Sequence, residues 1–256
     1  MSTPQVIWFE FPGLPPGATQ VRCAFQTRQG GFSAPPYNDG NISLTVGDDP
    51  GAVIKNRRAL LETLGVSAWS EEDQIHGDGV ILDAPATPLD KAGTSQADGL
   101  TTAERGLALC IKTADCQPIM LAHRSGKYIA ALHAGWRGNR INFPGSGVAA
   151  FCKHYRLDPA EVMAVRGPSL GPDAAEFVNF DQEWGDEFLP WYNPATRCMD
   201  LWALTRHQLT VAGLKAANIH SIDLCTYTRG DLFHSFRRDG AQSGRQASCI
   251  WLAEVQ

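Results

Sequence analysis

Three segments of the chain place a potential metal ligand or nucleophile among small residues. They are residues 74–78 (Gln-Ile-His-Gly-Asp), 113–118 (Thr-Ala-Asp-Cys-Gln-Pro) and 132–138 (Leu-His-Ala-Gly-Trp-Arg-Gly). Each lies where a strand-like run gives way to a loop, and a side chain at the rim of a sheet can point into a cleft while the strand holds it rigid. The candidates for chemistry are therefore His76, Cys116 and His133.

Two imidazoles and one thiolate are a donor set that suits zinc. The separations of 40 residues between His76 and Cys116 and of 17 between Cys116 and His133 are too wide for a zinc finger, so the ligands would converge only in the folded chain. Three protein ligands would leave the fourth tetrahedral position open, which is the catalytic pattern. Copper is an alternative metal, because copper(II) also binds nitrogen and sulfur ligands tightly.

The same residues allow two other interpretations. Cys116 could act as a thiolate nucleophile with His133 as its base, in the manner of a cysteine hydrolase. Alternatively, both histidines could be hydrogen-bonded loop residues and Cys116 a buried apolar side chain. Loss of activity with a chelator would favour the metal, whereas alkylation of an active metal-free enzyme would favour the dyad.

Composition excludes several classes of protein. The net charge of -5, from 22 basic against 27 acidic residues, argues against a nucleic-acid binder, which would usually carry a basic stripe. No window holds the roughly 18 uninterrupted apolar residues of a membrane span. Seven scattered cysteines without a Cys-x-x-Cys pair suggest neither a disulfide framework nor a zinc ribbon. We therefore expect a cytoplasmic protein with a single domain spanning residues 1–256, a monomer or weak homo-oligomer.

The elements that must position these residues can be predicted from apolar periodicity. Short β-branched runs predict strands at residues 6–9, 21–25, 107–111, 119–122, 128–132, 162–165 and 222–225. Between 107 and 132 the gaps are too short for crossover helices, which favours antiparallel or mixed sheets. The sequence thus predicts a mixed α/β (α+β) fold with flanking helices, not a Rossmann fold.

The clearest predicted helix opens at Asp48-Asp49-Pro50 and closes at Gly65, with an acidic cap and an early proline at one end and a glycine stop at the other. A second helix is expected over 201–217 behind Asp200, and weaker ones over 147–155 and 181–188. These elements complete the frame in which the three candidate residues would meet.

The segments around His76, Cys116 and His133 resemble the hallmark segments of the laccase-domain family. Its members are described as polyphenol oxidases, purine nucleoside phosphorylases and, in some bacteria, a peptidoglycan editing factor. Further segments resemble the family in the same order along nearly the whole chain, at residues 27–33, 41–50, 56–57, 97–102, 225–226, 235–240 and 244–248. The resemblance implies that the family's zinc ligands fall on the three candidate residues.

Two features qualify the resemblance. Residues 173–175 (Asp-Ala-Ala) follow a glycine-proline loop where many members have cysteines and an aromatic residue, so the resemblance assigns this loop no redox role. The chain has seven histidines and no His-x-His pair, so it cannot assemble the trinuclear copper cluster of a true laccase. Copper-dependent polyphenol oxidase activity would then be adventitious.

Phosphorolysis of a nucleoside requires a group that holds phosphate beside the anomeric carbon. Arginine suits this role because it can form two parallel hydrogen bonds with phosphate. The candidates are Arg28 in a glycine-containing loop and Arg245 behind a glycine. Arg237 and Arg238 are adjacent, so only one of them could face the site if they lie on a strand.

The resemblance implies phosphorolysis of purine nucleosides such as adenosine, inosine and methylthioadenosine, together with deamination of adenosine, in one pocket. Asn41, Asp78 and Asp98 could bind the ribose hydroxyls or orient the imidazoles. Trp136 could stack on a purine or pack the core beneath its loop. The alternative function is an amidase-like hydrolase that edits a UDP-linked peptidoglycan precursor, using the same cysteine and histidines.

Overall fold

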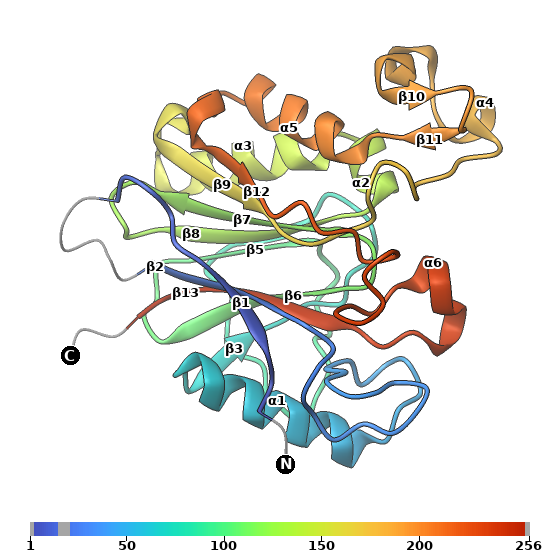
Figure 1. Cartoon of the computed structure of the whole chain (residues 1–256). Helices are drawn as coiled ribbons and strands as arrows, with labels where there is room; N and C mark the ends of the chain where they lie inside the picture. Colours follow the sequence, from blue (N-terminus) through green and yellow to red (C-terminus); the bar gives the residue numbers. More distant parts are fainter. Residues whose placement is uncertain (1–2, 15–20, 254–256) are drawn as a thin grey trace.

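Two β-sheets stacked face to face, with helices on their outer faces, form the body of the molecule (Figure 1). The computed structural model describes residues 3–14 and 21–253. The five-stranded sheet has the order β1-β2-β13-β6-β3 and the six-stranded sheet the order β12-β9-β7-β8-β5-β4. Parallel and antiparallel pairs occur in both sheets, which confirms a mixed α+β fold rather than a doubly wound one.

The strands of the five-stranded sheet are β1 (Val6–Phe9), β2 (Val21–Gln26), β3 (Ala68–Ser70), β6 (Leu107–Thr113) and β13 (Gln246–Leu252). Those of the six-stranded sheet are β4 (Val80–Ile81), β5 (Gly99–Thr102), β7 (Gln117–His123), β8 (Ile129–Ala134), β9 (Val162–Arg166) and β12 (Ile219–Ser221). A separate hairpin joins β10 (Tyr192–Asn193) and β11 (Cys198–Met199).

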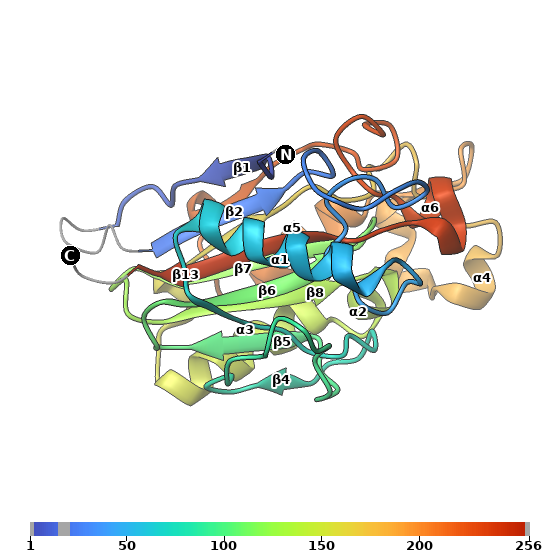
Figure 2. The same cartoon turned by 90° about the horizontal axis from the view of Figure 1, so that it is seen from below.

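The helices are α1 (Pro50–Leu64), α2 (Trp136–Arg140), α3 (Phe143–Tyr155), α4 (Phe180–Glu183), α5 (Leu201–Val211) and α6 (Phe236–Asp239). Helix α1 lies across the five-stranded sheet (Figure 2), whereas α3 and α5 cover the six-stranded sheet (Figure 1). Helices α2 and α6 lie toward the same end of the two sheets (Figures 1 and 2). No helix among the described residues is long and apolar enough to cross a membrane.

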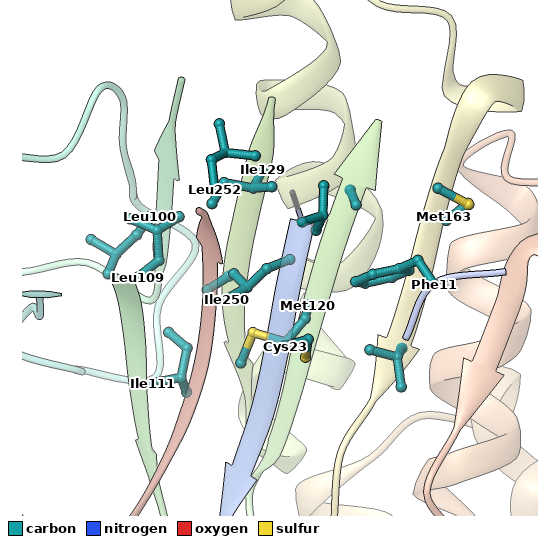
Figure 3. Packing of buried hydrophobic residues seen from close by; sticks show 14 of the residues in the cluster. Phe11, Cys23, Leu100, Leu109, Ile111, Met120, Ile129, Met163, Ile250 and Leu252 are labelled. Carbon is teal, nitrogen blue, oxygen red and sulfur yellow. The ribbon is translucent and has the colours of Figure 1, made fainter. Parts of the chain in front are cut away.

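The main core lies between the two sheets. Leu109, Ile111 and Ile250 from one sheet meet Met120 and Ile129 from the other (Figure 3). Neighbouring residues along the same strands point outward into two further apolar layers beneath the helices, as the two-residue period of a strand requires. Strands buried on both faces are rigid supports for side chains at their ends.

Local signals set the ends of α1 as the sequence predicts. The Asp49 carboxylate accepts from the Ala52 N–H at 2.8 Å, Pro50 occupies the first turn, and Gly65 ends the helix with φ of 69°. Helix α5 begins behind Asp200 as predicted but stops at Val211 rather than at 217, because Gly213 takes φ of 103°. Helix α3 extends four residues before the predicted start at 147.

Two predictions of elements were wrong. The strand expected at 222–225 lies at Ile219–Ser221, where pairing with β9 decides its position. The helix expected at 181–188 is broken near Gly185, whose backbone is extended, into α4 and a 3-10 turn. In addition, β3, β4 and β5 were not predicted, since they are short and carry few of the apolar residues that mark a strand.

A short corner between β6 and β7 carries the chain from one sheet to the other. Asp115 turns the chain with a φ of 92°, a conformation that non-glycine residues rarely adopt. Its carboxylate accepts from the Thr226 hydroxyl at 2.7 Å and from the Arg237 N–H at 2.6 Å. This corner therefore fixes Cys116 at the end of the seam between the sheets.

Candidate metal centre

Three loops and strand ends bring His76, Cys116 and His133 together. His76 comes from the loop between β3 and β4, Cys116 from the corner between β6 and β7, and His133 from the C-terminal end of strand β8. One donor atom from each lies within 4.8 Å of the others, and the Cys116 Sγ is 3.7 Å from the His76 Nε2. Within residues 3–14 and 21–253 this is the one group of three or more such residues that could hold a metal ion.

The distance between the Cys116 and His76 donor atoms fits two ligands of one zinc ion. Bond lengths of about 2.3 Å to sulfur and about 2.0–2.1 Å to nitrogen, at a tetrahedral angle, place the two donor atoms about 3.6 Å apart. The observed sulfur-to-nitrogen distance of 3.7 Å agrees with that value. Cys116 and His76 are therefore spaced as two ligands of one zinc ion would be, and a donor atom of His133 lies within 4.8 Å of both.

Asp98 holds both histidines from behind. Its Oδ1 lies 2.8 Å from the His133 Nδ1 and also accepts from the His76 N–H at 2.9 Å, while its Oδ2 accepts from the Gly77 N–H at 2.6 Å. The bond between Asp98 and the His133 Nδ1 fixes the His133 ring and directs its Nε2 toward Cys116 and His76. The backbone bonds stabilise the unusual φ of 61° at His76.

The segment that leads to His76 is held against β6 by Gln74. The Gln74 side chain donates to the carbonyl and accepts from the N–H of Lys112, both at 2.8 Å, so it acts as an additional strand residue beside β6. On the other side, a Cβ atom at Gly135 would come within 2.9 Å of the Cys116 Sγ and of the His76 ring. Only glycine allows the chain after β8 to pass so close to the ligands.

The electrostatics of the group favour a thiolate. Burial acts to raise the pKa of Cys116, but the positive charge and hydrogen bonds of His133, and then of His76, outweigh it and lower the pKa to about 6. Burial acts to lower the pKa of His133, yet Cys116 and Asp98 raise it overall. A thiolate held between two imidazoles is the deprotonated form that binds a soft or borderline metal.

These three residues line a cavity of about 620 Å³, which is in the range of sites that hold small organic ligands. The charged side chains in its wall are Glu72, Asp73, Lys112, Asp115, Arg137, Arg237 and Arg245. Apolar ones include Trp136, Leu170, Phe177, Leu201 and Phe236. The cavity thus joins the metal-ligand group to several cations and to aromatic rings.

Among the predicted site residues, Arg245 lies in the cavity wall. Burial lowers its pKa, and the negative charges of Cys116 and Asp115 act in the opposite direction, so the guanidinium is within their electrostatic reach. Its Nη1 donates to the carbonyls of Ser243 and Gly244 at 2.8 and 2.9 Å, and the guanidinium carbon lies 5.8 Å from the centre of the Phe236 ring. These contacts fix the cation in place.

The other predicted polar residues lie outside the cavity wall. Arg28 donates to the carbonyls of Asn38 and Gly230, Asn41 is fully buried and accepts from the Arg245 N–H at 2.9 Å, and Asp78 is exposed. Asp98 lies behind the histidines rather than in front of them. The structure therefore brings Arg245 to the metal-ligand group and leaves Arg28, Asn41 and Asp78 apart from it.

Arg237 and Arg238 do not lie on a strand, as the sequence analysis supposed, but on the single turn of α6. Arg237 lines the cavity, whereas Arg238 turns away to Asp239 and to the carbonyl of Phe233. Trp136 packs against Phe177 and other apolar residues of a satellite cluster, with ring centroids 5.7 Å apart. The ring therefore supports the cavity wall as part of that cluster.

Sequence reasoning missed three residues of the site. Asp115 positions the corner that carries Cys116, while Lys112 and Glu72 lie in the cavity wall. Asp115 precedes the candidate ligand Cys116 in the segment 113–118, and this position could have identified it as a residue of the site. Glu72 carried none, because consecutive acidic residues are typical of a solvated loop.

The chain is similar to proteins of known name along almost its whole length. A purine nucleoside phosphorylase of Pseudomonas aeruginosa is 35% identical over 248 residues, which are 93% of this chain and 96% of that protein. The purine nucleoside phosphorylase YfiH of Escherichia coli is 32% identical over 250 residues, covering 91% and 94% of the two chains. The crystal structure of YlmD from Geobacillus stearothermophilus superposes with a TM-score of 0.82 at 26% identity, covering 99% of this chain and 100% of that one.

The sequence model of one family matches almost the whole described chain. It covers residues 22–253 and carries the description multi-copper polyphenol oxidoreductase laccase. The matched range includes all three metal-ligand candidates and every residue of the cavity wall. The protein is therefore a member of this laccase-like family, to which the sequence analysis had pointed by resemblance.

Proposed function

We propose that the protein is a zinc-dependent purine nucleoside phosphorylase that takes adenosine, inosine and methylthioadenosine. The observation that carries the proposal is the single cavity in which His76, Cys116 and His133 meet Arg245. The names of the relatives as purine nucleoside phosphorylases support the same reaction. The volume of about 620 Å³ leaves room for a nucleoside and a phosphate together.

The residues of the cavity suit the demands of phosphorolysis. Phosphate carries negative charge, and Arg245 with Arg237 supplies cations beside the ligand group. Aromatic rings at Phe177 and Phe236 provide faces on which a purine can stack. A zinc ion held by the three ligands supplies a Lewis acid that stabilises negative charge on the substrate.

Deamination of adenosine is a second activity that we assign to the same site. His76, Cys116 and His133 would hold zinc through three protein ligands and would leave a coordination position for substrate, as in catalytic rather than structural zinc sites. Polyphenol oxidation with added copper is by comparison adventitious, because the described residues offer one candidate metal group rather than the several that a multicopper mechanism requires.

The main alternative is a hydrolase that uses Cys116 as a nucleophile on a nucleotide-linked cell-wall precursor. The lowered pKa of Cys116 suits a nucleophile as well as a ligand. A dyad, however, needs one histidine, and here two imidazoles converge on the thiolate, with a Cys116-to-His76 distance that matches a pair of zinc ligands. This second imidazole favours the metal centre.

The test is to measure zinc content and phosphate-dependent release of free base for the wild type and for Cys116→Ala. We expect one equivalent of zinc and release of base in the wild type, with both lost in the variant. Cys152→Ala, which removes a thiol from α3 outside the cavity, is the matched control and should keep both. No release from any of the three nucleosides by zinc-loaded protein would overturn the phosphorylase proposal. Metal-free protein that hydrolyses the cell-wall precursor and is inactivated by alkylation would establish the hydrolase.

A further inference from the structure

Glu72 is a buried acid in the wall of the cavity. It lies two residues beyond β3, in the loop that leads to His76, and its exposed fraction is 0%. It lines the same cavity as the metal-ligand group. Neither the metal-ligand donors nor the hydrogen bonds that hold them use its side chain.

The Glu72 carboxyl has no hydrogen-bond partner within the described part of the chain. Eight buried side-chain nitrogen and oxygen atoms there lack a partner, and four belong to the cavity wall: two on Glu72 and one each on Thr113 and Gln117. Buried polar groups are ordinarily satisfied, because an unpaired one costs about 1–3 kcal/mol. A wall with this many free polar atoms is suited to a ligand that supplies the missing bonds.

Lys112, whose positive charge acts on Glu72, forms no hydrogen bond with the Glu72 carboxyl. The Lys112 ammonium donates to the carboxylate of Glu71 at 2.9 Å and to the backbone carbonyl of Glu72 at 2.7 Å. Burial raises the pKa of Glu72 to about 8. The positive charges of Lys112 on β6 and His133 on β8, and the N–H dipole of its own backbone, act to lower this pKa, and the charge of Glu71 acts to raise it. The raised pKa favours the protonated carboxyl, which carries a proton that it can donate.

We propose that Glu72 is a catalytic residue that transfers its carboxyl proton to the purine as the glycosidic bond breaks. The inference rests on the proposed phosphorylase function and names a group for the same site. Arg245 then holds the attacking phosphate and Glu72 receives the departing base. General acids of this kind act best when their pKa lies close to the working pH.

The transfer leaves no atom or charge unaccounted for. The bond between C1′ and N9 breaks, a bond between C1′ and a phosphate oxygen forms, and the electron pair of the broken bond stays on the purine. The Glu72 proton neutralises the purine at N7. The resulting carboxylate takes up the proton that hydrogen phosphate carried, so nucleoside and hydrogen phosphate give ribose 1-phosphate and neutral purine.

The experiment compares two substrates on the zinc-loaded wild type and on Glu72→Gln. Inosine needs a proton on its base to depart, whereas 7-methylinosine already carries a positive charge on its base and departs without one. We expect Glu72→Gln to lower kcat for inosine by about 10²- to 10⁴-fold, the usual contribution of a general acid. Turnover of 7-methylinosine should stay within a few-fold of the wild type, and the zinc content should be unchanged.

Equal slowing of both substrates would show a structural or binding role and would overturn the proposal, as would no slowing of either. Failure of the phosphorylase function itself would look different, since the wild type would then release base from neither nucleoside. The wild type provides a second measurement that needs no variant. Its turnover of inosine should fall as the pH rises through about 8, where Glu72 ionises, while that of 7-methylinosine should not.

Discussion

Glu71 and Glu72 are adjacent buried acids with opposite surroundings. Glu71 accepts from the Arg57 guanidinium at 3.1 Å, from the Lys112 ammonium at 2.9 Å and from the Gly93 N–H at 3.1 Å. Glu72 has no partner among the described residues and lines the cavity. The chain itself satisfies the first acid, which ties α1 to the five-stranded sheet. The second acid is left for a ligand, and this difference separates a structural charge from a functional one.

The same isosteric change at the two positions gives the most direct test of this difference. Glu71→Gln leaves the buried Arg57 and the partly buried Lys112 without their counter-charge, and breaking a buried ion pair costs about 3–5 kcal/mol. We expect a loss of that size in the free energy of unfolding, measured with urea near pH 6, whereas Glu72→Gln leaves no cation without its counter-charge and should not lower it. A loss below about 1 kcal/mol at Glu71, the range of an exposed pair, would contradict the structural role.

The difference in unfolding free energy between the wild type and Glu72→Gln should change as the pH rises. Because the pKa of Glu72 is raised to about 8 from 4.5, the native state holds this proton more tightly than the unfolded state. Its stabilising contribution is therefore complete below pH 4.5 and is lost as the pH rises through about 8. Glu72→Gln cannot ionise, so the variant should become more stable than the wild type at pH 9, by a few kcal/mol at most.

Urea unfolding of both zinc-loaded proteins at pH 5, 7 and 9 measures this effect. Titration of the metal ligands is common to both proteins and cancels in the difference. The charges of Lys112 and Glu71, and the metal centre at His133, act on Glu72 in both proteins. A difference in unfolding free energy that stays constant from pH 5 to pH 9 would mean that Glu72 is already ionised in the native protein.

Asp98 shares features with both Glu71 and Glu72. It is buried and paired like Glu71, but it supports the metal-ligand group at the cavity. Asp98→Asn removes the charge behind His133 and can donate from its amide where the carboxylate accepted. Loss of such a supporting contact typically costs 10- to 100-fold in metal affinity, so we expect about that weakening for zinc by competition with a chromogenic chelator. Asp78→Asn, an exposed change in the same segment, is the control. Equal affinities in the two variants would show that Asp98 does not support the centre.

The sequence predicts those parts of the molecule that depend on local chemistry. The ends of α1 follow from Asp49 and Gly65, and β1 matches its predicted range, because caps and apolar runs are readable over a few residues. Resemblance to a family supplied the metal-ligand group, which spacing alone left open. The strand at Gly99–Thr102 was missed because its pairing with β8, not its own composition, makes it a strand.

The functional wall of the cavity depends on long-range contacts that no local pattern carries. Arg28 and Arg245 both lie close to glycines in the sequence, yet only Arg245 reaches the cavity. Glu71 and Glu72 have the same residue type and neighbouring positions, and the fold alone assigns one to Arg57 and the other to the wall. The prediction that only one of Arg237 and Arg238 faces the site holds for a helical turn rather than for a strand.

The smallest expected effect concerns Arg28, whose surroundings resemble those of Glu71 more than those of Glu72. Its guanidinium donates to the carbonyls of Asn38 at 2.9 Å and Gly230 at 3.3 Å, so the chain already uses its hydrogen bonds. Arg28→Ala should lower the free energy of unfolding by about 0.5–1.5 kcal/mol per hydrogen bond lost and leave the KM for phosphate unchanged.

Arg245→Ala is the matched substitution in the cavity wall, where the lost contact is to the substrate. We expect the KM for phosphate to rise in this variant, since a hydrogen bond to a charged group contributes about 1.5–3 kcal/mol. Steady-state rates at varied phosphate and saturating inosine, measured for both variants, decide between the two arginines. If instead Arg28→Ala raises the KM and Arg245→Ala does not, phosphate binds outside the cavity. The distinction between a charge that the chain satisfies and one that is left for a ligand would then not hold for these two arginines.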